Sequence, residues 1–517
     1  MSKIRRTLAA VAVATGAVFA TAATGQGGPG FKTSQTAMLT CPGCSEVDPI
    51  ITVGETLPSG YRFESIPDGI SIGKSNGKGT VDIYVNHETS LVPFPLPAPG
   101  VVGRSDFTNS IVSKLRLHQK SAGVLKGDYV IPSSANYQRF CSNFLVSKDH
   151  GFERDLLLTN EEARDHVNRT GTAWPPGPGA EQPGVVVALD VKSGEYKSIY
   201  GMGRHNHENS VGVPGYGYPV VLSGDDTFVS NPPESQLYLY VAENGNAVWN
   251  DEGTLYAFVA DGKTNYNEVT TADVLTGEFV AVPEPIASGK RPDGSDITRA
   301  VDFPAYPAPP SGVPDGPQWV LDQWGNTLNK PVFDFVRIED IAYDRNDSNV
   351  VYLADSGRGS GTIRPNGRIW KMVLDPNQPT KVTSLTILIE GGNATGVAGD
   401  IHQPDNLETT ERSLLIQEDP STANQFGNPA RIWRYDLVAQ TKEVVATVNL
   451  TGPATNPGSW ESSGIVDASS VLGPGAFLVD IQSHGWELER SPEPPVPNQV
   501  NFMREAGQML LLRNEDW

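Results

Sequence analysis

Short runs of bulky apolar residues recur along the whole chain, separated by turns rich in Gly, Pro, Asn and Asp. The runs contain Val, Ile, Tyr, Phe and Trp, which are the residues favoured in β-strands. Long stretches with the period of an amphipathic helix are hard to find. The pattern therefore predicts an all-β protein.

One phrase recurs four times: a small residue, then alternating bulky residues, then a polar turn. Repeated use of one unit is typical of a β-propeller, whose blades bury their faces on one another. A β-sandwich is the alternative. The spacing between copies is irregular, so we expect Pro- and Gly-rich insertions at 171–183, 283–319 and 487–499 to form loops. The copies of the phrase are residues 184–190, 253–259, 367–373 and 430–436.

The N-terminus has the pattern of an export signal, because basic residues precede an Ala-rich apolar stretch that ends in small residues near Ala20. We expect residues 1–22 to be a signal peptide, 23–59 a lead-in segment and 60–517 a single propeller domain. The protein is then exported to the periplasm, the cell surface or the medium. No later stretch could span a membrane.

Three cysteines cannot form a disulfide framework in a chain of this length. Cys41 and Cys44 are separated by two residues, and no second CxxC is present. A small local disulfide is therefore favoured over a redox pair or half of a zinc site. Cys141 is expected to be a buried structural thiol.

The chain is strongly acidic: it has 517 residues, with 39 Lys and Arg against 60 Asp and Glu, and a formal charge of −21. A negative field of this size argues against nucleic acid or an anionic membrane as a partner. It favours cations. We expect a monomer that acts on a small molecule.

Acidic residues gather in short phrases beside the predicted strands. In a propeller such positions surround the central channel, although a solvated turn is the alternative for any single phrase. Converging carboxylates must be protonated, paired with Arg or bound to metal. Oxygen-rich sets of this kind suit a hard cation such as Ca²⁺. The phrases are Asn86-His-Glu88, Glu161-Glu162, His207-Glu208-Asn209, Gly224-Asp-Asp226, Arg337-Ile-Glu339-Asp340, Pro404-Asp405-Asn406, Glu418-Asp419, and Glu461-Ser-Ser-Gly464 with Asp467.

Two arginines are candidates for binding an anion. Arg337 and Glu339 lie two residues apart, so on a strand both side chains point to the same face. There the guanidinium could hold an oxyanion while the carboxylate holds a metal; an ion pair on a solvated surface is the alternative. Arg204 is a second candidate of the same kind. His207 and His484 are better explained as hydrogen-bonded core residues than as ligands.

Motifs for nucleophilic catalysis and nucleotide binding are absent: the sequence has no GxSxG elbow, no Walker loop and no GxGxxG between strand and helix. If the protein is an enzyme, metal-assisted attack is the route that these residues favour.

The phrases occur in the order seen in PhoX-like proteins, and the chain resembles this family over about residues 60–485. These are exported bacterial proteins whose characterised members are alkaline phosphatases. The matching phrases are Ile66-Pro-Asp-Gly69, Asn86-His-Glu88, Arg139-Phe-Cys-Ser142, Leu158-Thr-Asn-Glu-Glu162, Gly203-Arg204 with His207-Glu-Asn209, Arg337-Ile-Glu339-Asp340, Asp405-Asn-Leu407, Gln417-Glu-Asp419, Glu461-Ser-Ser-Gly-Ile465 with Asp467, and Gln482-Ser-His484.

The resemblance implies a six-bladed β-propeller whose channel holds an iron and calcium cluster and which hydrolyses phosphate monoesters. By motif, Glu208 and Glu339 resemble the metal-binding glutamates, and Arg337 resembles the arginine that contacts phosphate, with Arg204 as the second catalytic candidate. The residues expected to bind metal are Glu161, Glu162, Glu208, Glu339, Asp405, Asn406, Glu418, Asp419 and Glu461.

One position departs from the family pattern. The PhoX enzymes have an iron-ligating cysteine in a Thr-Cys-Glu-Glu phrase, and this sequence has Asn160 at the matching position. An amide oxygen suits Ca²⁺ better than iron, so calcium is the expected cofactor and iron the second candidate. Substitution of Cys141 for this cysteine in space stays open. Two further functions stay open. The protein could be a non-catalytic calcium-binding propeller, or a calcium-dependent propeller hydrolase such as a lactonase.

Overall fold

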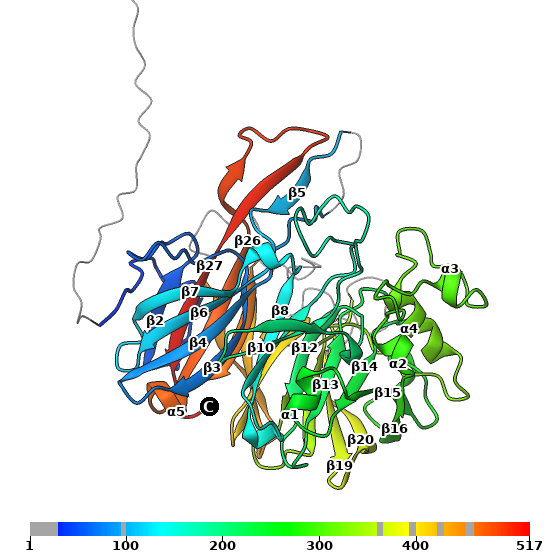
Figure 1. The fold of residues 1–517 in the computed structure, drawn as a ribbon. Coiled ribbons are helices and arrows are strands. Elements are labelled where there is room, and N and C mark those ends of the chain that lie inside the picture. The colour runs from blue at the N-terminus through cyan, green and yellow to red at the C-terminus, as the bar shows by residue number, and fades with distance from the viewer. Residues whose placement is uncertain (1–28, 95–99, 359–365, 392–399, 421–428, 450–459) are drawn as a thin grey trace, which may run out of the picture.

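The computed structural model describes residues 29–94, 100–358, 366–391, 400–420, 429–449 and 460–517. The predicted signal peptide lies outside the described residues. The described part of the chain consists mainly of antiparallel β-strands, with short helices in the connections, and this confirms the all-β class (Figure 1). None of the helices in these ranges has the length and apolar character needed to cross a membrane.

Burial along the strands explains why short apolar runs form them. β18 (Val350–Asp355) buries every side chain, because its sheet is packed on both faces. β16 (Leu275–Ala281), further out, alternates between buried and more exposed side chains. A strand buried on both faces, such as β18, therefore reads as a continuous apolar run in the sequence, and an outer strand such as β16 reads as an alternating one.

The strands fall into six consecutive groups, in which neighbours along the chain pair with each other. The third and fourth groups are joined through β16 and β20 into one nine-stranded sheet. The groups are β3 (Pro67–Ser75), β4 (Thr80–His87), β6 (Ile111–His118) and β7 (Val124–Ile131); β8 (Phe140–Val146), β9 (Leu156–Glu161), β10 (Val186–Asp190) and β11 (Tyr196–Ile199); β12 (His207–Gly212), β13 (Val220–Asp225), β14 (Leu237–Val241), β15 (Thr254–Ala260) and β16; β17 (Ile338–Tyr343), β18, β19 (Arg368–Asp375) and β20 (Gln378–Glu390); β21 (Pro404–Thr409), β22 (Ser413–Glu418), β23 (Arg431–Asp436) and β24 (Lys442–Val448); and β25 (Glu461–Asp467), β26 (Ala476–Ser491) and β27 (Val500–Arg513).

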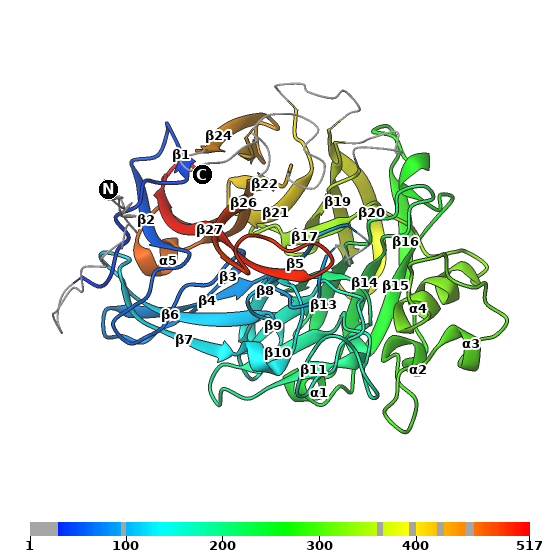
Figure 2. The same ribbon diagram turned by 90° about the horizontal axis from the view of Figure 1, so that it is seen from above.

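The first strand of each group lies on the inside of the molecule. β3 contacts β8, β8 contacts β12, and the contacts continue through β17 and β21 to β25, which contacts β3 again. Figure 2 shows the sheets arranged around this common centre. The chain thus has the ring of inward-facing strands that is characteristic of a propeller.

The N-terminal residues take part in this ring. β1 (Leu39–Thr40) pairs with β24, and β2 (Glu46–Thr52) pairs with β27. Two short parts of the segment expected as a lead-in therefore add outer strands to the last two groups. A disulfide joins Cys41 to Cys44, as predicted.

The recurring sequence phrase corresponds to equivalent strands. Three copies form β10, β19 and β23, each the third strand from the centre of its group. The fourth copy, residues 253–259, covers β15, the fourth strand of its group. Three of the four copies thus mark one repeated structural position.

The expected insertions lie between strands, but two are more ordered than predicted. Residues 283–319 contain α2, α3 and the start of α4, and residues 487–499 begin inside β26, which forms a long hairpin with β27. This hairpin and β5 (Gly103–Asp106), which pairs with β27, stand above the ring in Figure 1 and lie across its middle in Figure 2. The helices are α1 (Gly245–Trp249), α2 (Glu284–Ala287), α3 (Arg299–Asp302), α4 (Pro317–Asn326) and α5 (Ser469–Leu472), with 3-10 turns η1 (Ser133–Ala135), η2 (Lys148–His150), η3 (Tyr200–Met202) and η4 (Tyr266–Glu268).

Candidate metal centre

The inner strands all begin at the same end of the ring, and nearly all of them place a metal-binding type of side chain at the second position. The sixth inner strand, β25, carries its acid at the first position, Glu461. The residues at the second positions are Asp68 in β3, Cys141 in β8, Glu208 in β12, Glu339 in β17 and Asp405 in β21.

A β-bulge follows the start of every inner strand. In each case the pairing with the next strand shifts register within the first few residues. A bulge releases residues from the ladder and re-aims their side chains. Because all six bulges lie at the same end, they turn the polar side chains of different strands toward one centre.

Several inner strands are also entered through a strained residue. Ile66, Arg139, Arg337 and Gln403 immediately precede β3, β8, β17 and β21, and their φ angles are 48°, 44°, 63° and 46°. Positive φ is unfavourable for residues other than Gly, and most of all for a β-branched residue such as Ile66. Strain of this kind persists only where the surrounding structure fixes the backbone, and it is concentrated at functional sites.

Seven side chains lie close enough together to bind metal ions. Three sets of ligand atoms each lie within 4.8 Å of one another: Asp68, Glu88 and Cys141; Cys141, Glu162 and Glu208; and Glu208, Glu339 and Asp405. Because the sets share Cys141 and Glu208, they form one continuous row, which we call the central cluster. Glu88 and Glu162 are half-buried, and the other five are buried.

The cluster carries more negative charge than its surroundings neutralise. Burial raises the pKa of Glu208, Glu339 and Asp405 well above the usual range, and the neighbouring carboxylates raise it further. Burial also raises the pKa of Asp68 to about 6. Without a cation, these groups would have to hold protons.

Two carboxylate oxygens in the cluster lack a protein partner. Asp68 Oδ1 and Glu208 Oε2 are buried and make no hydrogen bond to the residues that the structure describes. Buried polar atoms are rarely left in this state unless a water or an ion binds them. The donor set, mostly carboxylate oxygens with one sulfur, fits Ca²⁺ and allows a softer metal beside Cys141.

Arg337 adjoins the cluster through Glu339. Its Nε and Nη2 donate to the two oxygens of Asp226 at 2.9 and 3.1 Å, and its Nη2 lies 2.6 Å from Glu339 Oε1. The guanidinium also lies over the ring of Phe228. Arg337 is thus a buried, oriented cation at one side of the carboxylates.

Arg204, the second candidate, lies elsewhere. It is buried against Asp296, with Nη1 at 3.2 Å from Oδ1, and it donates to the backbone carbonyl of Gln182. The structure therefore gives Arg204 a role in holding the 171–183 and 283–319 insertions together.

Two of the expected metal ligands also have other partners. Glu161 is held by Arg169, whose Nη1 and Nη2 lie 2.6 and 2.7 Å from its two oxygens. Glu418 is held by Arg431 at 2.7 Å and by Trp433 Nε1 at 2.8 Å. Both are buried ion pairs outside the central cluster.

The remaining candidates border the cluster. Asp419 and Glu461 are buried and act electrostatically on Glu339 and Glu88 respectively. Burial and Asp419 raise the pKa of Glu461 to about 7, while His484, 3.4 Å away, opposes that rise. Asn406 accepts a hydrogen bond from Gly464 N at 3.1 Å and donates one to Ser142 Oγ.

A polar layer lies directly behind the cluster and joins neighbouring strand groups. Asn209 donates to Asp340, and Asp340 accepts from Leu407 N at 2.8 Å. Asn209 and Asp340 also line the inner side of a cavity of about 400 Å³, which includes Arg345 on its wall. The layer thus stands between the metal-binding end of the inner strands and the cavity at their other end.

Four residues at the site were not among those expected from the sequence: Cys141, Asp68, Glu88 and Asp226. Cys141 Sγ is 3.2 Å from Asp68 Oδ2, and burial raises the pKa of this thiol. Asn160, at the position of the family cysteine, instead donates to Ser142 O at 3.0 Å. All four missed residues stood within quoted phrases. The start of each inner strand, where ligand-type residues recur, is the signal that could have identified two of them, Asp68 and Cys141.

Comparisons with known proteins give a likeness in structure only. No protein-family model and no curated protein matches the sequence. PhoX of Pseudomonas fluorescens, solved in complex with vanadate, a transition state analogue, superposes with a TM-score of 0.56 at 16% identity, covering 94% of this chain and 98% of that chain. The periplasmic gluconolactonase PpgL of Pseudomonas aeruginosa gives a TM-score of 0.35 at 11% identity, covering 79% of each chain. The superposition on PhoX shows that the fold of this chain is PhoX-like.

Proposed function

We propose that this protein is an exported, metal-dependent phosphoesterase related to PhoX, in which the six strand groups are the blades of a propeller. It hydrolyses phosphate monoesters at the central cluster. The observation that carries the proposal is the convergence of Glu208, Glu339 and Asp405, from three different inner strands, within 4.8 Å.

The cluster supplies ligands of two kinds. Carboxylates of Glu208, Glu339 and Asp405 suit calcium, and Cys141 adds a sulfur that would favour iron on the side facing Glu162. When bound, such cations would offset the negative charge, bind a phosphate dianion and activate water. The loss of the family cysteine at Asn160 is then compensated by a thiol from the neighbouring strand β8.

Arg337 would provide the protein's own cation for the phosphoryl group. Its bidentate contact with Asp226 fixes the guanidinium, and the Nη2 edge faces Glu339. A phosphoryl oxygen that replaces the Glu339 oxygen at Nη2 receives a charge-assisted hydrogen bond. Because the donor is already oriented, it stabilises charge on the equatorial oxygens with little reorganisation.

Hydrolysis of p-nitrophenyl phosphate by the exported protein tests this function. Activity should be lost on dialysis against EDTA and return when metal is added back. Arg337→Ala should lower kcat/KM by roughly 10²- to 10³-fold. Arg345→Ala is the matched control, because Arg345 lies just beyond the opposite end of β17, paired with Glu408, and should leave kcat/KM unchanged.

The result also separates the alternatives. Turnover that survives EDTA, or that Arg337→Ala leaves intact, would overturn the mechanism. Calcium bound without turnover of any phosphomonoester would support a binding module instead. Turnover of lactones but not of phosphates would assign a different propeller hydrolase.

A further inference from the structure

Arg139 occupies the position in the second strand group that Arg337 occupies in the fourth. Each residue immediately precedes an inner strand, each has a positive φ, and each is followed two residues later by a member of the central cluster, Cys141 or Glu339. An arginine in the left-handed region is unusual on its own. Its occurrence at equivalent positions beside one cluster suggests a shared task.

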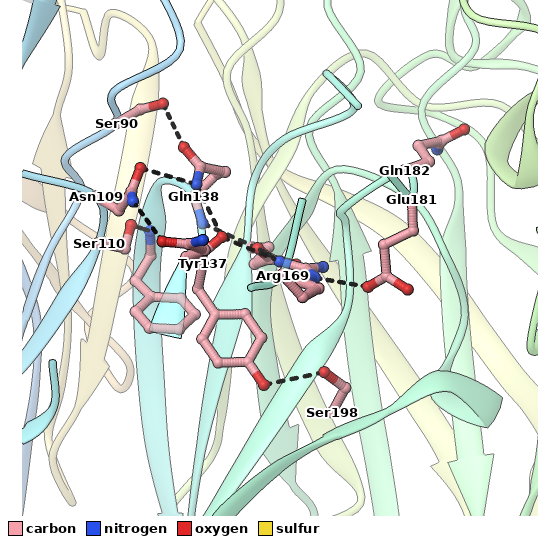
Figure 3. Close-up of polar contacts among 12 residues, drawn as sticks. Ser90, Asn109, Ser110, Tyr137, Gln138, Arg169, Glu181, Gln182 and Ser198 are labelled. Carbon is pink, nitrogen blue, oxygen red and sulfur yellow. Dashed lines mark hydrogen bonds and ion pairs between the residues drawn. The ribbon is translucent and has the colours of Figure 1, made fainter. Parts of the chain in front are cut away.

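The backbone of Arg139 is held on both sides. Its N–H donates to Thr89 O at 3.1 Å, and its carbonyl accepts from the N–H of Glu162, a cluster residue, at 3.0 Å. The preceding residue, Gln138, accepts from Ser90 Oγ at 2.7 Å and donates to Asn109 Oδ1 at 3.0 Å. Figure 3 shows the hydrogen bonds that join Gln138 to Ser90 and to Asn109.

A buried ion pair completes this support. Gln138 N–H donates to Glu161 Oε1 at 2.9 Å, and Glu161 is held by both ends of the Arg169 guanidinium. Arg169 also lies over the ring of Tyr137 and reaches Glu181, as Figure 3 shows. A network of buried, hydrogen-bonded polar side chains therefore holds Arg139 in a strained conformation.

The side chain of Arg139 differs from that of Arg337 in access and charge. It is 19% exposed, whereas that of Arg337 is 4% exposed. Its Nη1 lies 3.1 Å from Asp165 Oδ2, and Asp165 is itself 45% exposed, so this ion pair is weak. Arg139 also acts electrostatically on Glu88 in the cluster and on Asp106 in β5.

A dianionic substrate needs such a cation. Asp226 and Glu339 together outweigh the charge of Arg337, whereas Arg139 is balanced mainly by a solvent-exposed carboxylate. We propose that Arg139 is a second substrate-contacting residue, whose guanidinium binds a phosphoryl oxygen from the β8 side of the cluster. This inference rests on the proposed function and adds a residue to its substrate site.

Arg139→Gly gives the sharpest test, because Gly relieves the backbone strain while removing the guanidinium. We expect the melting temperature to stay equal or rise, while KM for p-nitrophenyl phosphate and the inhibition constant of vanadate rise roughly 10- to 100-fold. Arg139→Lys should have a KM and a vanadate inhibition constant between those of the wild type and Arg139→Gly. Added guanidinium ion should partly restore both constants in Arg139→Gly. The control is Gln440→Gly, which relieves a positive φ of 56° in a turn between β23 and β24 and should leave KM unchanged.

Each outcome is decisive. If the wild type hydrolyses p-nitrophenyl phosphate and Arg139→Gly keeps its KM and its vanadate inhibition, Arg139 does not contact substrate and the proposed function stands. Arg139→Gly could instead raise KM and also lower the melting temperature. If neither added guanidinium ion nor the Arg139→Lys substitution then restores KM or the vanadate inhibition constant, the role of Arg139 is structural and the inference is wrong. If the wild type neither turns over phosphomonoesters nor binds vanadate, both proposals fall.

Discussion

Glu161 and Glu162 are adjacent acids whose side chains have separate environments. Glu161 ends β9 and is neutralised by Arg169, whereas Glu162 belongs to the central cluster, where burial, Asp226 and Glu88 raise its pKa. Successive residues of a strand point to opposite faces. One acid therefore stabilises the fold, and its neighbour is stabilised by a proton or a cation.

Matched glutamine variants should separate these roles. Glu161→Gln removes the charge from a buried ion pair, so we expect the free energy of unfolding to fall by about 3 kcal/mol. Glu162→Gln should leave the stability of the metal-free protein unchanged or higher, because burial disfavours the charged form, while bound metal and turnover fall roughly 10- to 100-fold. Chemical denaturation and elemental analysis measure the two effects. The same loss of stability in both variants would contradict this assignment.

Cys141 gives a second prediction at this scale. Its sulfur belongs to two of the three ligand sets, and a thiolate favours iron over calcium. We expect Cys141→Ser to lower the iron content of the purified protein and leave its calcium content unchanged. Asn160→Cys, which introduces a cysteine as in the Thr-Cys-Glu-Glu phrase of the PhoX enzymes, is the comparison variant. Equal iron in the wild type and in Cys141→Ser would show that this thiol is not a ligand.

The sequence could identify the acidic phrases but not their grouping. The structure places Glu208 and Glu339 in one ligand set and Arg337 beside Glu339, and the resemblance to the PhoX-like family was the signal that singled out these three residues. Glu418 has the same appearance in the sequence, yet its partner Arg431 belongs to the next strand along, and that pairing depends on the register of the sheet. Long-range pairing of this kind separates an ion-paired acid from a metal ligand, and single-sequence patterns do not contain it.

At the scale of elements, the ring closes where β25 meets β3. Gly464 in β25 has a φ of 50°, and a Cβ atom at this position would lie 2.3 Å from Asp68 O. The close approach brings the last strand group against the first and sets Asp68 beside Asn406 and Ser463. A glycine is therefore required here for packing as well as for its backbone conformation.

Gly464→Ala should destabilise the protein by about 3 kcal/mol or more, because backbone strain and a clash with main-chain atoms add together. Gly485→Ala is the control, since Gly485 has a φ of 81° but nothing within 4 Å of the added Cβ. It should cost only about 1 kcal/mol. Urea denaturation of both variants measures the difference, and equal losses would mean that the β25–β3 contact is not tight in solution.

At the scale of the whole molecule, metal binding and charge are coupled. The chain has a formal charge of −21, and six of its acids converge on one centre. Their folded-state pKa values are raised, so the metal-free fold favours their protonated forms. The contribution of each group to the stability of the metal-free fold is fully present below the usual pKa of a carboxyl group. It is lost as the pH rises through the folded-state pKa, which is about 6 for Asp68 and about 7 for Glu461.

Metal binding should reverse this dependence, because a bound cation favours the ionised carboxylates. We therefore expect the difference in melting temperature between the metal-loaded and EDTA-treated protein to grow as the pH rises from about 5 to about 8. Each unit of pKa shift corresponds to about 1.4 kcal/mol, so two such carboxylates contribute a few kcal/mol. Using the difference removes the contributions of buried groups away from the cluster, such as His87, whose lowered pKa acts equally on both forms. Glu461→Gln should reduce the slope, and a difference independent of pH would mean that the central cluster does not exchange protons for metal.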